Sequence, residues 1–257
     1  MRAIYVAGYG RSGSTLLGRV LAAQKQAVAV GEVKKVGSRA VLARAICACG
    51  CDFPTCGYWR EVDRRLSDVS LPRELPSDRR RFLEGYLGLL VPMTVLRSLV
   101  RRCAFSDRYP AVSLEVGLQT MIHVSGSAIV DISKTTRTTA NRPRLLAATG
   151  VEIDLYMSSR SLRDTIRSHR GARTRQGRGL GLWWQSAVIV TVNRYLAHLA
   201  ARWCARSLRV PLRRRTLDET RAMAAEMPVS ADSLNHMIAG NRSRHLPHTR
   251  EASPQGD

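Results

Sequence analysis

Short apolar runs alternate with longer helical patterns along this chain, and the alternation predicts an α/β fold. Apolar runs of strand length lie near residues 3–8, 27–31, 127–132 and 152–158, and helical patterns follow them. Strands that are joined through helices pair in parallel, so they form a doubly wound sheet with helices on both faces. In such a sheet ligands bind outside the carboxyl ends of the strands. We therefore expect the functional residues to follow directly after the predicted strands.

Other segments lie outside this alternation. Residues 60–125 are expected to form a helical insertion, because the stretch from Phe82 to Leu90 is apolar at helical spacing. A long helix is expected from Leu182 to Arg206. The segment from Arg170 to Gly179 is rich in glycine and arginine, which favours a mobile loop. The polar residues 246–257 have the composition of a disordered tail. We therefore predict one domain over residues 1–245 of the 257.

The turn after the first predicted strand has the composition of a phosphate-binding loop. A strand, a glycine-rich turn and a helix N-terminus together direct backbone N–H groups and the positive helix end at an anion. In the nucleoside-triphosphate loop G-x-x-x-x-G-K-[ST], Gly8, Gly13 and Thr15 would fit, but Ser14 stands where the lysine belongs. Arg11 is the strong cation of this loop. The segment therefore predicts an anion site that differs from that of a typical kinase.

The segment from Arg11 to Leu17 resembles the 5′-phosphosulfate loop of sulfotransferases that use 3′-phosphoadenosine 5′-phosphosulfate (PAPS). It is similar to the branch with R-S-G-[ST]-T in place of the lysine, to which tyrosylprotein sulfotransferases are related. The resemblance implies a P-loop-like three-layer α/β fold and transfer of a sulfuryl group to a hydroxyl without a metal. It assigns the phosphosulfate to a loop made of Gly10, Arg11, Ser12, Gly13, Ser14 and Thr15.

Two further segments resemble the family's nucleotide site. Arg160 ends a predicted strand and Ser168 follows at the spacing with which the family holds the 3′-phosphate. The segment that contains Asn241 and Arg244 resembles the H-x-x-x-G-N-x-x-R stretch with which bacterial members close over the nucleotide. Residues 210–219 depart from the Tyr-Glu-Asp-Leu segment of many relatives, so a degenerate nucleotide-binding relative without activity stays open as an alternative.

Three residues are candidates for the transfer step: Arg11 of the loop, which supplies positive charge where negative charge develops, Glu32 and Lys134. Glu32, in a Gly-Glu pair after an apolar run, resembles the family's base, and a carboxylate beside an anion site can accept the proton of an attacking hydroxyl. Lys134 follows the apolar run near residue 132 and resembles the family's lysine that neutralises charge on the transferring group. A glutamate that begins a helix, or an exposed lysine after a strand, would leave the same pattern, so structural roles stay open for both.

The charge of the chain is consistent with an anionic ligand. Lysine and arginine number 41 against 20 acidic residues, a formal charge of +21, which suits nucleic acid, an anionic membrane surface or an anionic substrate. We interpret the arginine runs 79–81 and 213–215, each beside helical patterns, as solvated faces. No nucleic-acid reading motif accompanies them, so no nucleic-acid partner is expected. A P-loop small-molecule kinase is the alternative, with the lysine missing. The acceptor could be a small molecule, a carbohydrate, a lipid or a natural product.

Four cysteines cluster at positions 47, 49, 51 and 56. Their C-x-C-x-C-x4-C spacing lacks the paired C-x-x-C knuckles of a zinc ribbon, and no histidine is near, so free thiols are favoured over a metal site. The apolar runs are too short for a signal segment or a membrane span. We therefore expect a cytoplasmic protein without a transmembrane segment.

Overall fold

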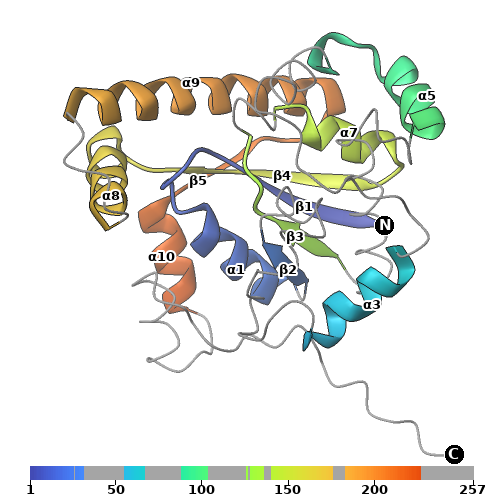
Figure 1. Ribbon diagram of the computed structural model, residues 1–257, viewed down its shortest axis with the longest axis horizontal. Helices are drawn as coiled ribbons and strands as arrows, with labels where there is room; N and C mark the ends of the chain where they lie inside the picture. Colours follow the sequence, from blue (N-terminus) through green and yellow to red (C-terminus); the bar gives the residue numbers. More distant parts are fainter. Residues whose placement is uncertain are drawn as a thin grey trace, which may run out of the picture.

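The central element of the structure is a parallel five-stranded sheet in the order β2-β3-β1-β4-β5, with helices on both faces (Figure 1). The computed structural model describes residues 1–25, 27–31, 55–66, 88–103, 126, 128–135, 140–175 and 183–226. The strands are β1 (Arg2–Ala7), β2 (Val28–Gly31), β3 (Ile129–Asp131), β4 (Glu152–Ser159) and β5 (Arg213–Thr216). The helices are α1 (Ser14–Gln24), α3 (Gly57–Leu66), α5 (Met93–Cys103), α7 (Arg142–Ala148), α8 (Leu162–Arg175), α9 (Trp183–Leu208) and α10 (Leu217–Ala225). The predicted α/β fold with a parallel sheet is confirmed, as are the four predicted strands.

The two faces of the sheet follow the period of two along β1. Ile4 and Val6 pack against α1, in a cluster that includes Leu17 and Leu21. Ala3, Tyr5 and Ala7 belong to the core on the other face, with residues of α9. Full burial of a side chain such as Leu17 contributes about 1.5–3 kcal/mol, so the alternation fixes which helix covers which face. Figure 1 shows α9 and α1 on opposite sides of the sheet.

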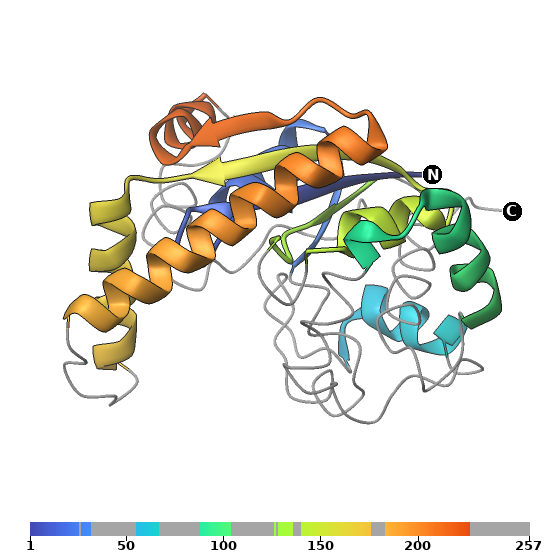
Figure 2. The same cartoon turned by 90° about the horizontal axis from the view of Figure 1, so that it is seen from above.

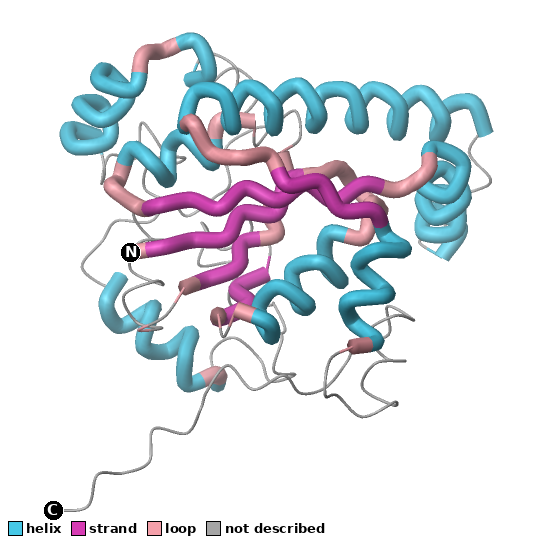
Figure 3. Tube along the Cα trace, turned by 180° about the vertical axis from the view of Figure 1, so that it is seen from behind, coloured by secondary structure: helices cyan, strands magenta, loops and turns pink. Residues whose placement is uncertain are grey.

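Helix α10 lies beside α1 and completes that layer. Leu16 and Val20 of α1 form a buried cluster with Ala224 of α10. Viewed from behind, in Figure 3, both helices lie on the same side of the sheet. The strands of the sheet all pair in parallel. The carboxyl ends of β1, β4 and β5 therefore lie along one edge, where α1, α8 and α10 begin.

The run Arg213–Arg215 forms most of strand β5, which the sequence pattern did not predict. It pairs in parallel with β4, Tyr156 opposite Arg213 and Ser158 opposite Arg215. Arginine has little preference for strands, so this pairing is a tertiary effect that local sequence cannot reveal. Arg213 and Arg214 are exposed, in line with the expected solvated face.

The expected loop at 170–179 was wrong over its first half. Helix α8 continues to Arg175, and Thr174 donates a hydrogen bond to the carbonyl of Arg170 one turn earlier. Gly171 lies inside this helix and costs about 1 kcal/mol of helix stability. The packing of α8 against α9 offsets that cost. The long helix expected from Leu182 to Arg206 is confirmed as α9.

The expected insertion at 60–125 is helical where it is described. Most of α3 and all of α5 fall within it, and α3 begins at Gly57. Arg144 of α7 is buried and donates hydrogen bonds to the carbonyls of Gly88, Leu89 and Val91, which anchors the start of the α5 region. The rest of the insertion and the tail at 246–257 lie outside the described residues. Among the helices that are described, none has the length and apolarity to cross a membrane.

Candidate functional site

The chain leaves β1 and β4 in opposite directions, which places a crevice at their carboxyl ends. From β1 it passes through α1 to β2 on one side, and from β4 it passes through α8 and α9 to β5 on the other. Adjacent strands with divergent connections mark the switch point where open α/β sheets bind ligands. The loop that contains Arg11 follows β1, and Arg160 directly follows β4. Two of the predicted site residues therefore lie on either side of this switch point.

The loop between β1 and α1 has a backbone that the sequence explains. Gly8 has a φ of 150° and Gly13 one of 92°, which favour glycine. A Cβ at Gly8 would lie 2.6 Å from the Ser158 hydroxyl, and one at Gly13 would lie 2.6 Å from the Leu217 side chain. Arg11 has a φ of 66°, which costs a non-glycine residue about 1–2 kcal/mol. The backbone conformation at Arg11 is therefore destabilising, and the Arg11 side chain is exposed.

Two pairs of contacts tie this loop to the end of β4. The hydroxyls of Ser12 and Ser158 are 2.6 Å apart, and both residues are buried. The Tyr9 hydroxyl donates to the Arg160 carbonyl at 2.8 Å and accepts from the Arg160 backbone N–H at 3.1 Å. Tyr9 is itself buried, and both of its bonds to Arg160 are partly buried. The backbones that carry Arg11 and Arg160 are consequently held in one arrangement.

Helix α1 begins at this loop with an open N-terminus. Gly13 is its N-cap, and within the described chain no side chain caps the helix and its first turn has no acidic residue. At this end the Leu17 N–H donates a hydrogen bond to the Gly13 carbonyl at 3.0 Å. The N–H groups before Leu17 are the orphan donors of a helix start, and they add to the positive end of its dipole. The arrangement suits an anion next to Arg11.

Arg160 offers a buried donor at the same edge. Its side chain is half-buried, and its Nε has no hydrogen-bond partner among the described residues. A buried donor left without a partner costs about 1–3 kcal/mol, so an acceptor placed there recovers that free energy. An anionic oxygen would be the strongest acceptor for it.

Ser168 follows Arg160 by eight residues and lies on α8. It lies in the second turn of α8 and is half-buried, and no hydrogen bond joins the two residues in the part of the structure that is described. The predicted spacing of eight residues therefore spans the end of β4 and the start of a helix. A ligand that reaches both residues would have to bridge them.

Lys134 lies at the carboxyl end of β3 and is half-buried. Its φ is 70°, and its carbonyl accepts a hydrogen bond from the Tyr5 hydroxyl at 2.6 Å. Just before it, the buried Asp131 accepts from the Ser133 backbone N–H at 2.7 Å and forms an ion pair with Arg142 at 3.1 Å. These bonds fix the backbone that positions Lys134 beside the loop of β1, since β1 and β3 are neighbours.

Three predicted residues lie outside the described part of the chain: Glu32, Asn241 and Arg244. The residue before the first of them, Gly31, ends β2 with a φ of 73°. Because β2 is parallel to β3, its carboxyl end lies at the same edge of the sheet as Lys134. The placement of Glu32 at this edge stays a prediction.

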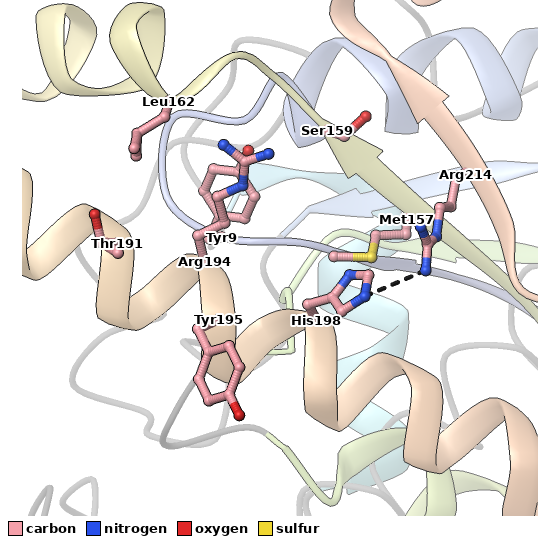
Figure 4. Close-up of a pocket in the computed structure, with 9 residues that line it drawn as sticks. All are labelled: Tyr9, Met157, Ser159, Leu162, Thr191, Arg194, Tyr195, His198 and Arg214. Atoms are coloured by element: carbon pink, nitrogen blue, oxygen red, sulfur yellow. Dashed lines mark hydrogen bonds between the residues drawn. The ribbon is translucent and has the colours of Figure 1, made fainter.

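A basic cleft of about 550 Å³ lies on the α9 side of this edge (Figure 4). Arg194 lies over the Tyr9 ring, 5.9 Å from its centroid, and an Arg214 N–H lies 3.2 Å from the His198 Nε2. Partial burial lowers the pKa of His198, and the charges of Arg214 and of arginines on α9 lower it further. The neutral ring can therefore accept the hydrogen bond from Arg214. The lining residues are Tyr9, Met157, Ser159, Leu162, Thr191, Arg194, Tyr195, His198 and Arg214.

The sequence pattern missed this cleft and the two ties between the loops. Arg194 and His198 are spaced by four on α9, a signal that they share one side of the helix, but their partner Arg214 lies on the unpredicted β5. Tyr9 and Ser158 stand beside predicted site residues, yet nothing in the pattern says that they bond across the sheet.

No cluster of three or more histidine, cysteine, aspartate or glutamate residues suited to a metal ion occurs in the described part of the chain. Cys56 is buried, and the other three cysteines of its cluster lie outside the described residues. Comparisons of the chain with models of protein families, with curated proteins and with solved structures found no match.

Proposed function

We propose that this protein is a P-loop-like sulfotransferase that moves a sulfuryl group from PAPS to a hydroxyl of an acceptor. The observation that carries the proposal is the pairing of the open α1 N-terminus and Arg11 with Arg160 across the switch point of the sheet. PAPS carries negative charge at both ends, a phosphosulfate on one side of the nucleoside and a 3′-phosphate on the other. Two cationic positions on tied backbones suit such a molecule better than a ligand with one anionic group.

The choice of sulfate over a transferred phosphate depends on Ser14. A kinase loop places a lysine at this position to reach the β- and γ-phosphates, and it uses Mg²⁺ to neutralise the remaining charge. A sulfuryl group carries less negative charge than a phosphoryl group. Arg11 and the N-terminus of α1 therefore supply enough fixed positive charge to stabilise the transfer of a sulfuryl group. Arg194 and Arg214 in the adjacent cleft add to the positive potential that attracts an anionic ligand.

In the proposed reaction the acceptor oxygen attacks the sulfur in line with the bond that breaks. The acceptor hydroxyl gives its proton to the Glu32 carboxylate as the new S–O bond forms. The bond between sulfur and the bridging oxygen of PAPS breaks, and adenosine 3′,5′-bisphosphate leaves with the electron pair. Arg11 and Lys134 stabilise the negative charge that develops on that bridging oxygen. Arg160, with Ser168, Asn241 and Arg244, would hold the 3′-phosphate.

Calorimetric titration tests the proposal against the other classes. We expect adenosine 3′,5′-bisphosphate to bind more tightly than adenosine 5′-monophosphate, and equally well with Mg²⁺ or with EDTA. Tighter binding of ATP that depends on Mg²⁺ would favour the kinase, and preferential binding of RNA would favour a nucleic-acid partner. A protein that binds the bisphosphate but transfers no labelled sulfuryl group from PAPS to any hydroxyl acceptor would be a nucleotide-binding relative without activity.

A further inference from the structure

Helix α9 buries small side chains and exposes large apolar ones. Toward the sheet it presents mostly alanine and other small residues, which let it approach closely: Ser186, Val190, Ala197, Ala200, Ala201, Cys204 and Ala205. On the opposite side lies what we call the outer stripe: Trp184, Val188, Val192, Tyr195, Leu199 and Trp203. Their exposed fractions run from 40% to 62%. This is the reverse of the usual surface helix, whose large apolar residues face the core.

The outer stripe is continuous along the helix. Its members follow one another by three or four residues, so they share one side of α9. From Trp184 to Trp203 the helix rises by about 28 Å at 1.5 Å per residue. Figures 1 and 2 show α9 as a straight helix at the periphery of the molecule. A continuous apolar surface of this length is uncommon on a monomer and marks an interaction site.

The charge around the outer stripe indicates what it contacts. No acidic residue occurs anywhere on α9, and Arg202, Arg206 and Arg209 are exposed at its C-terminal end. Tryptophan side chains stand at both ends of the stripe, the residue type that settles at the boundary between lipid headgroups and acyl chains. Apolar residues on one side, with tryptophan and arginine beside them, are the composition of a helix that lies in the surface of a bilayer.

We propose that α9 docks this protein on the surface of an anionic lipid bilayer, with the outer stripe among the headgroups and the adjoining arginines on lipid phosphates. The formal charge of +21 attracts the whole chain to such a surface. A second copy of the chain is the less suitable occupant, because it carries the same charge and the same exposed arginines.

Two matched double variants test the docking. Val188→Ser with Leu199→Ser removes a valine and a leucine from the outer stripe, 52% and 40% exposed. Val95→Ser with Leu99→Ser removes the same pair from α5, 47% and 40% exposed. Tyr195 is left unchanged because it also lines the basic cleft. All three proteins are mixed with phosphatidylcholine vesicles that contain either no phosphatidylglycerol or about a third of it, and the bound fraction is measured by flotation.

We expect the wild-type protein and the α5 variant to float with the anionic vesicles and to stay behind with the neutral ones. The outer-stripe variant should bind the anionic vesicles at least tenfold more weakly. Its melting temperature should equal that of the α5 variant, so that the loss of binding does not come from unfolding. Replacing Arg202 and Arg206 by glutamine should reduce the dependence on phosphatidylglycerol and on salt. Equal losses in the two double variants, or no binding by the wild type, would overturn the proposal. So would a wild-type dimer in light scattering that the outer-stripe variant alone abolishes.

Discussion

Helices α1 and α10 begin at the same edge of the sheet and pack against each other, yet their N-termini are capped differently. At α10 the Thr216 hydroxyl accepts from the Glu219 N–H at 3.1 Å, and the Glu219 carboxylate accepts from the Thr216 N–H at 3.0 Å. This is a complete capping box, with Asp218 as a further acidic residue in the first turn. At α1 a glycine stands at the cap, and in the described part of the chain no side chain or acidic residue closes the helix.

The difference in capping shows that the positive N-terminus of α1 is left without an acidic or capping side chain of the described chain. Helix α8, which follows β4, resembles α10, since the Ser161 hydroxyl accepts from the Asp164 N–H and donates to the Asp164 carboxylate. Of the helices that directly follow β1, β4 and β5, α1 alone keeps its orphan N–H groups and dipole free of its own acids. That open end lies next to Arg11. A fold that caps α8 and α10 and leaves α1 open has a place for an external anion.

The largest effect should come from Glu32→Gln, which tests whether transfer at the open N-terminus of α1 needs Glu32 as the base. The amide keeps the shape of the carboxylate and removes its basicity, so nucleotide affinity should stay nearly unchanged. Turnover should fall by roughly 10²–10⁴-fold, the usual weight of general-base catalysis. The measurement is sulfate transfer from labelled PAPS at saturating acceptor, once one is found. Turnover close to wild type would mean that a different group takes the proton.

Thr15→Glu makes α1 resemble α10 and should remove the difference between them. Thr15 is exposed in the first turn, so the new carboxylate occupies the positive helix end without disturbing the core. We expect the affinity for adenosine 3′,5′-bisphosphate to fall about 100-fold, because like charges brought together cost several kcal/mol. Titration calorimetry on Thr15→Gln, which adds similar size without charge, is the control. Similar losses in both variants would show that bulk and not charge matters.

Arg160→Ala tests the second cationic position. If its guanidinium bonds the 3′-phosphate, the preference for adenosine 3′,5′-bisphosphate over adenosine 5′-monophosphate should shrink by about 2–3 kcal/mol. Arg163→Ala, an exposed arginine in the first turn of α8, is the matched control and should leave the preference unchanged. An Arg160→Ala protein that still discriminates between the two nucleotides as the wild type does would refute this assignment.

Thr216→Ala opens the end of α10 and should give the smallest effect. Loss of the capping hydroxyl costs about 1 kcal/mol of stability, and Thr216→Ser should restore most of it. Chemical denaturation measures the loss. Nucleotide affinity should not change, because Arg11 and the loop of α1 are untouched. A nucleotide affinity that follows the stability of α10 would mean that both helix ends serve one function.

The sequence predicts the parts of this edge that depend on local chemistry. The glycines and Arg11 indicate an anion loop because their composition alone limits what the backbone can do, and strands β1 to β4 are apolar enough to be recognised. Strand β5 could not be found, since three arginines become a strand only by pairing with β4. The bonds from Tyr9 to Arg160 and from Ser12 to Ser158 join residues about 150 positions apart, so no local pattern contains them.

Amide NMR of the labelled protein during titration with adenosine 3′,5′-bisphosphate tests most directly whether α1 is the open end. The amide protons of Gly13, Ser14 and Thr15 should move downfield and saturate with the nucleotide, because new hydrogen bonds to an anion deshield them. Those of Leu217, Asp218 and Glu219 should stay nearly still, since the capping box already occupies that helix end. Saturating shifts at α10 with none at α1 would contradict the account.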